Sequence, residues 1–317
     1  MPFIAHEAVK TIGIVGAGTI GSSWAAWFLA RGLKVRLTDP SPATPELVRT
    51  YLEGAWPALR QLGVAHATLE QAASRLSFHA SAAEAATGAD FVQESAPERA
   101  AIKQALLEEI DAVLPPDRVI ASSTSGFGVT EMQAEMREPQ RLVVGHPFNP
   151  PHLIPLVEVV GGGRTSEAAV QWAIAFYNHV GKRAIHVRKE VPGHIANRLQ
   201  AALWREALHL VQEGVGSVDD VDAAIAYGPG LRWAVMGPHL TFHLAGGKGG
   251  MAHFFDHLGP NVEKWWADLG TPLITPELRD LIVGGVDEEI GDRSYEELVE
   301  QRDQTLLRVL AATAKRE

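Results

Sequence analysis

The 317-residue sequence contains no cysteine. This absence excludes disulfide bonds, thiolate metal sites and cysteine nucleophiles, and it is consistent with a reducing compartment. Long hydrophobic runs are also missing, since no apolar stretch reaches the ~18 residues that a membrane-spanning helix needs. The first ten residues lack the basic and apolar regions of a signal peptide. We therefore expect a cytoplasmic protein without a membrane partner, and we predict no metal site.

The sequence has fewer basic than acidic residues. The chain has 28 lysine and arginine residues against 38 aspartate and glutamate residues, which gives a formal net charge of −10. This balance argues against nucleic acid or an anionic membrane surface as a partner, and it mildly favours a cationic small molecule. Hydrophobic residues make up 46% and charged residues 21%, as in ordinary soluble globular proteins. The length predicts two domains.

Apolar runs alternate with helical patterns over the first 190 residues. Strands are predicted at 11–15, 34–38, 75–79, 90–93, 118–121, 141–145, 156–160 and 183–187. Helices are predicted between or after them at 19–30, 45–62, 98–113 and 166–180. This alternation is typical of the α/β class with a doubly wound, mostly parallel sheet.

The pattern changes near residue 190. One long amphipathic helix is predicted at 194–213, and the remainder consists of helical patterns broken by glycine clusters at 228–230 and 246–250. We therefore predict an N-terminal α/β domain over residues 1–190 and a smaller, all-helical domain over residues 191–317.

A glycine-rich turn follows the first predicted strand and opens the first predicted helix. It has the G-x-G-x-x-G pattern, with the residues Gly16, Ala17, Gly18, Thr19, Ile20 and Gly21. In a dinucleotide site, the first glycine permits a tight turn, the second lets the pyrophosphate approach, and the third lets the helix pack on the strand. The helix N-terminus offers free N–H groups to the phosphates. The pattern therefore predicts a Rossmann-type domain that binds a dinucleotide.

The end of the second predicted strand indicates which dinucleotide binds. Asp39 stands there, 18 residues after Gly21. A carboxylate at this place accepts the ribose 2′-hydroxyl and repels a 2′-phosphate, and the next residue is Pro40 rather than arginine. We therefore expect NAD rather than NADP. The alternative is a structural glycine turn in which Asp39 caps a loop.

A group of polar residues resembles the 3-hydroxyacyl-CoA dehydrogenase superfamily. Ser125, His146, Glu158 and Asn197 are separated by 21, 12 and 39 residues, and this spacing is similar to that of the family. They stand in the segments 122–126, 145–151, 156–160 and 192–198. The resemblance implies that these four side chains form the catalytic group of a dehydrogenase.

Two further positions are similar to those of the superfamily. Glu98 lies in the segment 94–99, and Lys103 lies in the helical pattern that follows. In the family, these positions lie along the nicotinamide side of the cofactor. The resemblance therefore implies that Glu98 and Lys103 belong to the cofactor site.

Hydride transfer from a secondary alcohol indicates a role for each catalytic candidate. His146 would remove the hydroxyl proton, because the ordinary pKa of histidine lies near neutral pH. Glu158 would bind the other ring nitrogen, fix the tautomer and stabilise the imidazolium. Ser125 and Asn197 would hold the reacting oxygen. Each residue also has a structural interpretation, but a carboxylate in an apolar strand needs a partner, which favours the pairing of Glu158 with His146.

Further segments resemble one branch of the superfamily, the L-carnitine 3-dehydrogenases. They lie at 54–60, 91–98, 187–193, 203–210, 230–233 and 244–247. The similarity extends over most of the chain, to about residue 260. It implies the oxidation of L-carnitine, a small-molecule substrate, to 3-dehydrocarnitine with NAD.

L-Carnitine carries a trimethylammonium group and a carboxylate. Aromatic faces attract the cation, and Phe148, Trp204 and Trp233 stand in segments near the predicted site. Each of these rings has core or interface packing as its alternative role. Arg198 or Arg232 is a candidate partner for the carboxylate.

Other functions stay open at this point. One alternative is a CoA-thioester dehydrogenase, although the sequence offers no obvious basic patch for the CoA phosphates. The other enzyme alternative is the sugar-acid branch, which resembles L-gulonate 3-dehydrogenase. A catalytically retired, crystallin-like binding protein is the alternative outside enzymes, and the intact catalytic group argues against it. The family resemblance also implies a homodimer formed by the helical domain, which could expose the apolar side chains Leu240, Phe242, Phe254 and Phe255.

Overall fold

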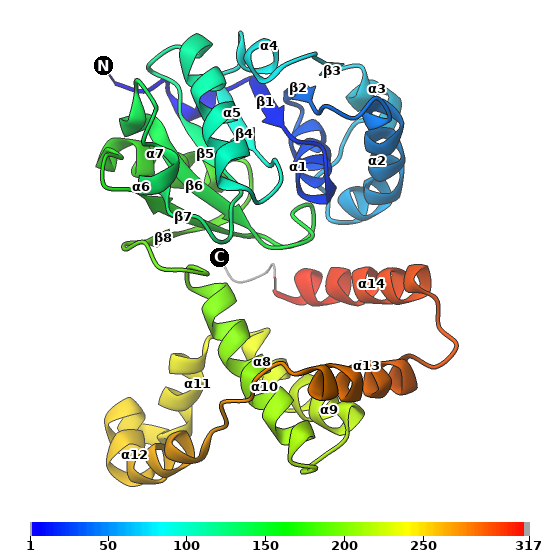
Figure 1. Cartoon of the computed structure of the whole chain (residues 1–317), viewed down its shortest axis with the longest axis vertical. Helices are drawn as coiled ribbons and strands as arrows, with labels where there is room; N and C mark the ends of the chain where they lie inside the picture. The colour runs from blue at the N-terminus through cyan, green and yellow to red at the C-terminus, as the bar shows by residue number, and fades with distance from the viewer. Residues whose placement is uncertain (1, 314–317) are drawn as a thin grey trace. The chain divides into compact units, whose positions relative to one another are not determined.

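The computed structural model describes residues 2–313, which fall into two compact units that divide between Asn197 and Arg198 (Figure 1). No helix among these residues is both long and apolar enough to span a membrane. The same residues contain no cluster of three or more histidine, aspartate or glutamate side chains that could hold a metal ion.

The first unit is built on an eight-stranded sheet. Its strands follow the order β3 (Leu76–Phe78), β2 (Lys34–Thr38), β1 (Thr11–Val15), β4 (Phe91–Glu94), β5 (Ile120–Ser122), β6 (Leu142–Pro147), β7 (Leu156–Gly161) and β8 (Arg183–Val187). Neighbouring strands are parallel except for the antiparallel pair β6 and β7. The predicted doubly wound, mostly parallel sheet is confirmed. The strand order reverses between β1 and β4, and open α/β sheets bind ligands at the carboxyl ends of strands beside such a reversal.

Each face of the sheet buries its own core. The side chains of Ile12 and Ile14 pack on one face, and that of Val15 packs on the other, because successive strand residues point to opposite sides. The first core includes residues of α1 (Thr19–Ala30), α2 (Thr44–Gln61), α3 (Leu69–Ala73) and α7 (Glu167–His179). The second includes residues of α4 (Ala82–Ala86), α5 (Ala100–Val113) and α6 (Val129–Met132). Two helical layers therefore hold the sheet between them.

Helix α1 is fixed against the sheet by aromatic packing. Trp24 and Phe28 are fully buried, and their rings stack with centroids 5.1 Å apart. Burial of one such side chain stabilises the fold by about 1.5–3 kcal/mol. The packing therefore fixes the N-terminus of α1, which carries the glycine-rich turn.

The second unit is helical, as predicted. It contains most of α8 (Ala196–Gln212), followed by α9 (Val218–Tyr227), α10 (Pro229–Trp233), α11 (Pro238–Ala245), α12 (Gly250–Asp268), α13 (Pro276–Ile290) and α14 (Tyr295–Thr313). Few of its apolar side chains are buried, and Trp265, Trp266 and Leu273 are 65%, 64% and 77% exposed. The unit thus exposes far more apolar surface than the sheet domain does.

Two predicted helices begin later than expected. The helix predicted from residue 194 starts at Ala196, because His194 has a φ of 49° and cannot join a right-handed helix. The helix predicted from residue 98 starts at Ala100, since its N-cap residue Arg99 has extended backbone angles. Both corrections involve residues at the carboxyl side of the sheet, where the candidate site lies.

Candidate active site

His146 and Glu158 lie directly opposite each other on the antiparallel strands β6 and β7. His146 Nδ1 is 2.9 Å from Glu158 Oε2, and the two residues are only 6% and 0% exposed. A carboxylate can only accept, so Nδ1 carries the proton and donates it to the glutamate. The second ring nitrogen, Nε2, is then left as a proton acceptor. The spacing of 12 residues therefore corresponds to a cross-strand pair.

Glu158 is held from its other side by the segment that starts α8. Its Oε1 accepts hydrogen bonds from the backbone N–H groups of Ile195 and Ala196, each at 2.9 Å. Burial alone would raise the pKa of Glu158, but the hydrogen bonds from His146 and from the two amides lower it more. The net pKa lies below its ordinary value. Glu158 is therefore a fixed anion at neutral pH.

Ser125 lies in the loop after β5, and Glu98 holds this loop by its backbone. Glu98 Oε1 accepts hydrogen bonds from the Thr124 hydroxyl, from Ser125 N at 3.1 Å and from Gly126 N at 2.9 Å. Burial raises the pKa of Glu98, but the Thr124 hydroxyl, the Lys103 ammonium and the two amides lower it below its ordinary value. The backbone position of Ser125 is therefore set by a charged residue.

Lys103 and Glu94 form a buried ion pair beside this loop. Lys103 Nζ lies 2.9 Å from Glu94 Oε1 and 3.5 Å from Glu98 Oε2, and the side chains of Lys103 and Glu94 are 1% and 0% exposed. Such a pair is costly to break, because removal of one partner leaves an uncompensated charge in the core. The sequence predicted Lys103 as a cofactor residue. Its contacts show that it holds Glu98.

The glycine-rich turn has the geometry that the pattern predicts. Gly16 has a φ of 96°, and a Cβ there would lie 2.6 Å from the Ser95 backbone. A Cβ at Gly21 would lie 1.8 Å from Gly16 O, whereas one at Gly18 would meet nothing within 4 Å. Gly18 caps α1 without any side-chain hydrogen bond, which leaves the first N–H groups of the helix, those of Thr19 and Ile20 among them, without a capping side chain. This open helix terminus fits a pyrophosphate.

Asp39 caps the same turn. Its Oδ2 accepts a hydrogen bond from Ala17 N at 2.8 Å, and its Oδ1 accepts one from Ser41 N at 3.0 Å. The loop-capping role that the sequence left open is therefore present. The Thr44 hydroxyl donates a third bond to Oδ1 at 3.4 Å. A carboxylate has about four acceptor positions, so these three bonds leave one for a ribose hydroxyl.

His194 lies beside His146, although it is not among the predicted site residues. Its ring centroid lies 5.2 Å from that of His146, and its Nε2 lies 3.2 Å from the Thr124 carbonyl oxygen. It is 4% exposed, and its φ of 49° is positive. In the sequence, the pair Gly193-His194 ahead of a predicted helix indicates a turn, but it does not indicate a role for the imidazole.

The predicted substrate residues are distributed over both units. Phe148 belongs to the first unit, and its ring meets that of His146 edge-on at 5.8 Å between centroids. Asn197 follows Ala196 in the first turn of α8 and is half-buried. Arg198, Trp204 and Trp233 belong to the second unit, where all three are exposed.

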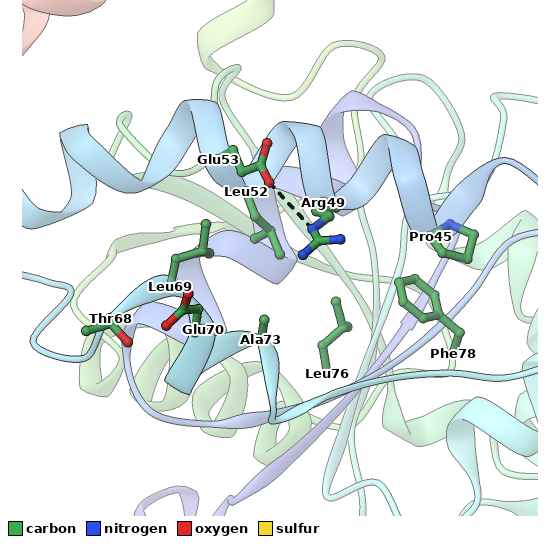
Figure 2. A pocket seen from close by; sticks show the side chains of 10 residues that line it. All are labelled: Pro45, Arg49, Leu52, Glu53, Thr68, Leu69, Glu70, Ala73, Leu76 and Phe78. Carbon is green, nitrogen blue, oxygen red and sulfur yellow. Dashed lines mark ion pairs between the residues drawn. The ribbon is translucent and has the colours of Figure 1, made fainter.

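Two cavities lie away from the His146–Glu158 pair. One of about 520 Å³ lies between α2, α3 and β3, and Figure 2 shows the ion pair between Arg49 and Glu53 at its edge. None of the predicted site residues lines it. The second, of about 850 Å³, lies within the helical unit and is lined by Trp204 together with the acidic residues Asp219, Asp222 and Glu289.

Comparison with known proteins gives the family. The chain matches the NAD-binding domain of 3-hydroxyacyl-CoA dehydrogenase over residues 11–191 and the C-terminal domain of the same family over residues 193–270. It is 53% identical to an L-carnitine dehydrogenase of Streptomyces coelicolor over 309 residues, which cover 98% of this chain and 96% of that protein. It is 49% identical to an L-carnitine dehydrogenase of a Pseudomonas species over 312 residues, which cover 98% and 96%.

Solved structures agree with this grouping. The fold is similar to that of an NAD+-dependent 5-formyl-3-hydroxy-2-methylpyridine-4-carboxylic acid 5-dehydrogenase, with a TM-score of 0.82 and 30% identity. The match covers 98% of this chain and 100% of that chain. It is also similar to FadB2 of M. tuberculosis, with a TM-score of 0.66, 27% identity and coverage of 88% and 95%. The cofactor is NAD. The chain therefore belongs to the 3-hydroxyacyl-CoA dehydrogenase family and is an NAD-dependent oxidoreductase.

Proposed function

We propose that the protein oxidises the 3-hydroxyl group of L-carnitine to 3-dehydrocarnitine. The observation that carries the reaction type is the buried hydrogen bond of 2.9 Å between His146 and Glu158. The identity of about half of all residues to proteins named L-carnitine dehydrogenase supports the choice of substrate.

The proposed mechanism starts at His146. Nε2 of His146 accepts the proton of the 3-hydroxyl group, and Glu158 stabilises the resulting imidazolium through the bond at Nδ1. Ser125 and Asn197 hold the reacting oxygen at hydrogen-bond distance from the base. Bound NAD supplies the hydride acceptor for the hydrogen on C3. Each turnover thus releases one proton and one NADH.

The cofactor is proposed to lie along the carboxyl ends of β1, β2 and β4. The open N-terminus of α1, with Gly16, Gly18 and Gly21 around it, would bind the pyrophosphate. Asp39 would accept a hydrogen bond from the ribose 2′-hydroxyl while it caps the turn. Glu98, fixed by Lys103, would line the nicotinamide side.

Recognition of the two charged ends of L-carnitine is proposed for separate side chains. The ring of Phe148, beside His146, offers an aromatic face to the trimethylammonium group, and Trp204 and Trp233 are further candidates. Arg198 or Arg232 would bind the carboxylate. Because the net charge of the chain is −10, a cationic substrate end is favoured over a polyphosphate such as CoA.

We also propose that the helical unit forms a homodimer and that the protein works in the cytoplasm. Leu240, Phe242 and Phe255 are 52%, 44% and 59% exposed, whereas Phe254 is buried. Large exposed apolar patches are typical of protein interfaces. Analytical ultracentrifugation at micromolar concentration tests the dimer, and a monomer would contradict it.

Initial rates of NADH formation test the substrate. L-Carnitine, 3-hydroxybutyrate, L-gulonate and 3-hydroxybutyryl-CoA are compared side by side at equal NAD concentration. We expect the highest kcat/KM with L-carnitine. A clear preference for the CoA ester or for L-gulonate would assign the chain to another branch of the family, and no turnover with any of the four would favour a retired enzyme.

A further inference from the structure

His194 occupies a backbone conformation that is uncommon for residues other than glycine. Its φ of 49° follows the φ of 75° at Gly193, and among residues 2–313 it is the non-glycine residue with a positive φ. The turn brings the N–H groups of Ile195 and Ala196 onto Glu158, which explains the conformation. It does not explain the side chain, because glycine or asparagine would adopt this turn more readily. Strain retained at such a position suggests a functional role.

The hydrogen bonding of His194 leaves one ring nitrogen unsatisfied. Nε2 lies 3.2 Å from the carbonyl oxygen of Thr124. A carbonyl can only accept, so Nε2 carries the proton and Nδ1 has a free lone pair. Nδ1 is buried, and no residue of the described chain donates to it. A buried acceptor without a partner is costly, and such atoms in a folded protein require an explanation.

The surroundings keep this ring neutral. Burial lowers the pKa of His194, and the neighbouring His146 lowers it further. The Thr124 carbonyl and the carboxylates of Glu158 and Glu98 act in the opposite direction, but the net pKa lies below its ordinary value. His194 is therefore a hydrogen-bond acceptor at neutral pH, and its free lone pair fits a donor with an N–H or O–H group.

The chemistry of the proposed substrate and of NAD limits the choice of donor. The carboxylate and the trimethylammonium group of L-carnitine carry no such hydrogen, and the hydroxyl proton passes to His146. The nicotinamide carboxamide of NAD carries an NH2 group. It is attached to the ring carbon next to the one that receives hydride, so it must lie close to the reacting hydroxyl and to His146, whose ring is 5.2 Å from that of His194.

The neighbouring carboxylates already have donors from the protein. Oε1 of Glu98 accepts three hydrogen bonds, from Thr124, Ser125 and Gly126, and its Oε2 lies 3.5 Å from the Lys103 ammonium. Glu158 accepts from His146 through Oε2 and from two amides through Oε1. His194 Nδ1 is the buried acceptor in this group that has no donor among the described residues.

We propose that Nδ1 of His194 accepts a hydrogen bond from the nicotinamide carboxamide of NAD and thereby helps to fix the orientation of the nicotinamide ring. This inference rests on the proposed function, because the role of His146 as the base places the nicotinamide ring beside it. It makes His194 a cofactor-binding residue that the glycine-rich fingerprint does not reveal.

Binding of two cofactors to matched variants tests the proposal. Dissociation constants are measured by calorimetry for NAD and for 3-acetylpyridine adenine dinucleotide, which has a methyl ketone in place of the carboxamide and therefore no N–H group. His194→Phe keeps a ring of similar size but has no nitrogen. We expect this variant to bind NAD about 5- to 10-fold more weakly and to bind the analogue with little change, because the loss is that of one hydrogen bond.

Two further variants complete the experiment. His194→Gly tolerates the positive φ and has no hydrogen-bond acceptor in its side chain, so it repeats the comparison if the phenylalanine variant fails to fold. His66→Phe changes an exposed histidine outside the site and should leave both dissociation constants unchanged. Circular dichroism confirms that each variant is folded.

Three outcomes are informative. A selective loss of NAD affinity in the His194 variants supports the proposal. An equal loss for both cofactors would show a purely structural role, and no loss would remove His194 from the cofactor site; either result overturns the proposal. Failure of the wild-type protein to oxidise L-carnitine would contradict only the proposed substrate, since the selective loss of binding is measured without substrate.

Discussion

Replacement of Glu158 by glutamine tests the His146–Glu158 pair in the most specific way. The carboxylate accepts three hydrogen bonds, one from His146 Nδ1 and two from the amides of Ile195 and Ala196. Glutamine offers one acceptor oxygen and one NH2 donor, so it cannot satisfy both sides. The two backbone amides are fixed, whereas the imidazole can change tautomer. We therefore expect the glutamine oxygen to face the amides and its NH2 group to face His146.

This arrangement would abolish the base. With a donor opposite Nδ1, His146 must carry its proton on Nε2, where it can no longer accept the hydroxyl proton. A wrong tautomer and the loss of general-base catalysis reduce turnover by about 10²- to 10⁴-fold, equivalent to about 3–5 kcal/mol of transition-state stabilisation. The side-chain volume changes little, so the fold should be retained.

The assay for Glu158→Gln is the steady-state rate of NADH formation from L-carnitine, with NAD affinity measured separately. We expect a large fall in kcat and an NAD dissociation constant close to that of the wild type. Glu108→Gln, at an exposed position of α5, is the matched control and should retain full activity. A kcat of Glu158→Gln within threefold of the wild-type value would refute the tautomer argument.

Three other changes follow from the same structure. Gly21→Ala should destabilise the fold and weaken NAD binding, since its Cβ would lie 1.8 Å from Gly16 O; an unchanged melting temperature would contradict this. Asp39→Ala should raise the NAD dissociation constant and leave the alcohol chemistry intact, which fluorescence titration and saturating-NAD rates can check. Burial lowers the pKa of Lys182 well below its ordinary value. This lysine therefore favours the unfolded state at neutral pH. The free energy of unfolding should rise as pH increases from the pKa of Lys182 in the folded state to its pKa in the unfolded state. Lys182→Met should flatten that rise in urea titrations; an unchanged pH dependence would show that Lys182 stays protonated over the Trp27 ring, 3.5 Å from its centroid.

Much of the fold could be predicted from the sequence because its signals are local. Buried parallel strands give apolar runs, and long helices such as α2 and α7 give a clear helical period. The short helices α3, α4 and α6 have only four or five residues, too few for a period to show, and they were not predicted. The domain boundary at 190–191 remains a prediction. The two compact units of the structure divide after Asn197.

The candidate site, like the fold, could be predicted only where the sequence carries a local signal. The spacing of His146 and Glu158 is informative because two antiparallel strands place residues at a fixed separation directly opposite each other. The role of Glu98 in holding the Ser125 loop arises from contacts across 27 residues, which no local pattern encodes. The unsatisfied nitrogen of His194 likewise depends on a left-handed turn and on the Thr124 carbonyl, 70 residues away.

His146 is the proposed base for oxidation of the 3-hydroxyl group of L-carnitine. The most direct measurement is NADH formation from L-carnitine by the wild-type protein and by His146→Ala, at saturating NAD and with NAD affinity measured in parallel. We predict steady turnover by the wild type and a loss of about 10²- to 10⁴-fold in the variant, with NAD binding nearly unchanged. Full activity of His146→Ala would contradict the base assignment, and no NADH from L-carnitine with the wild-type protein would contradict the substrate.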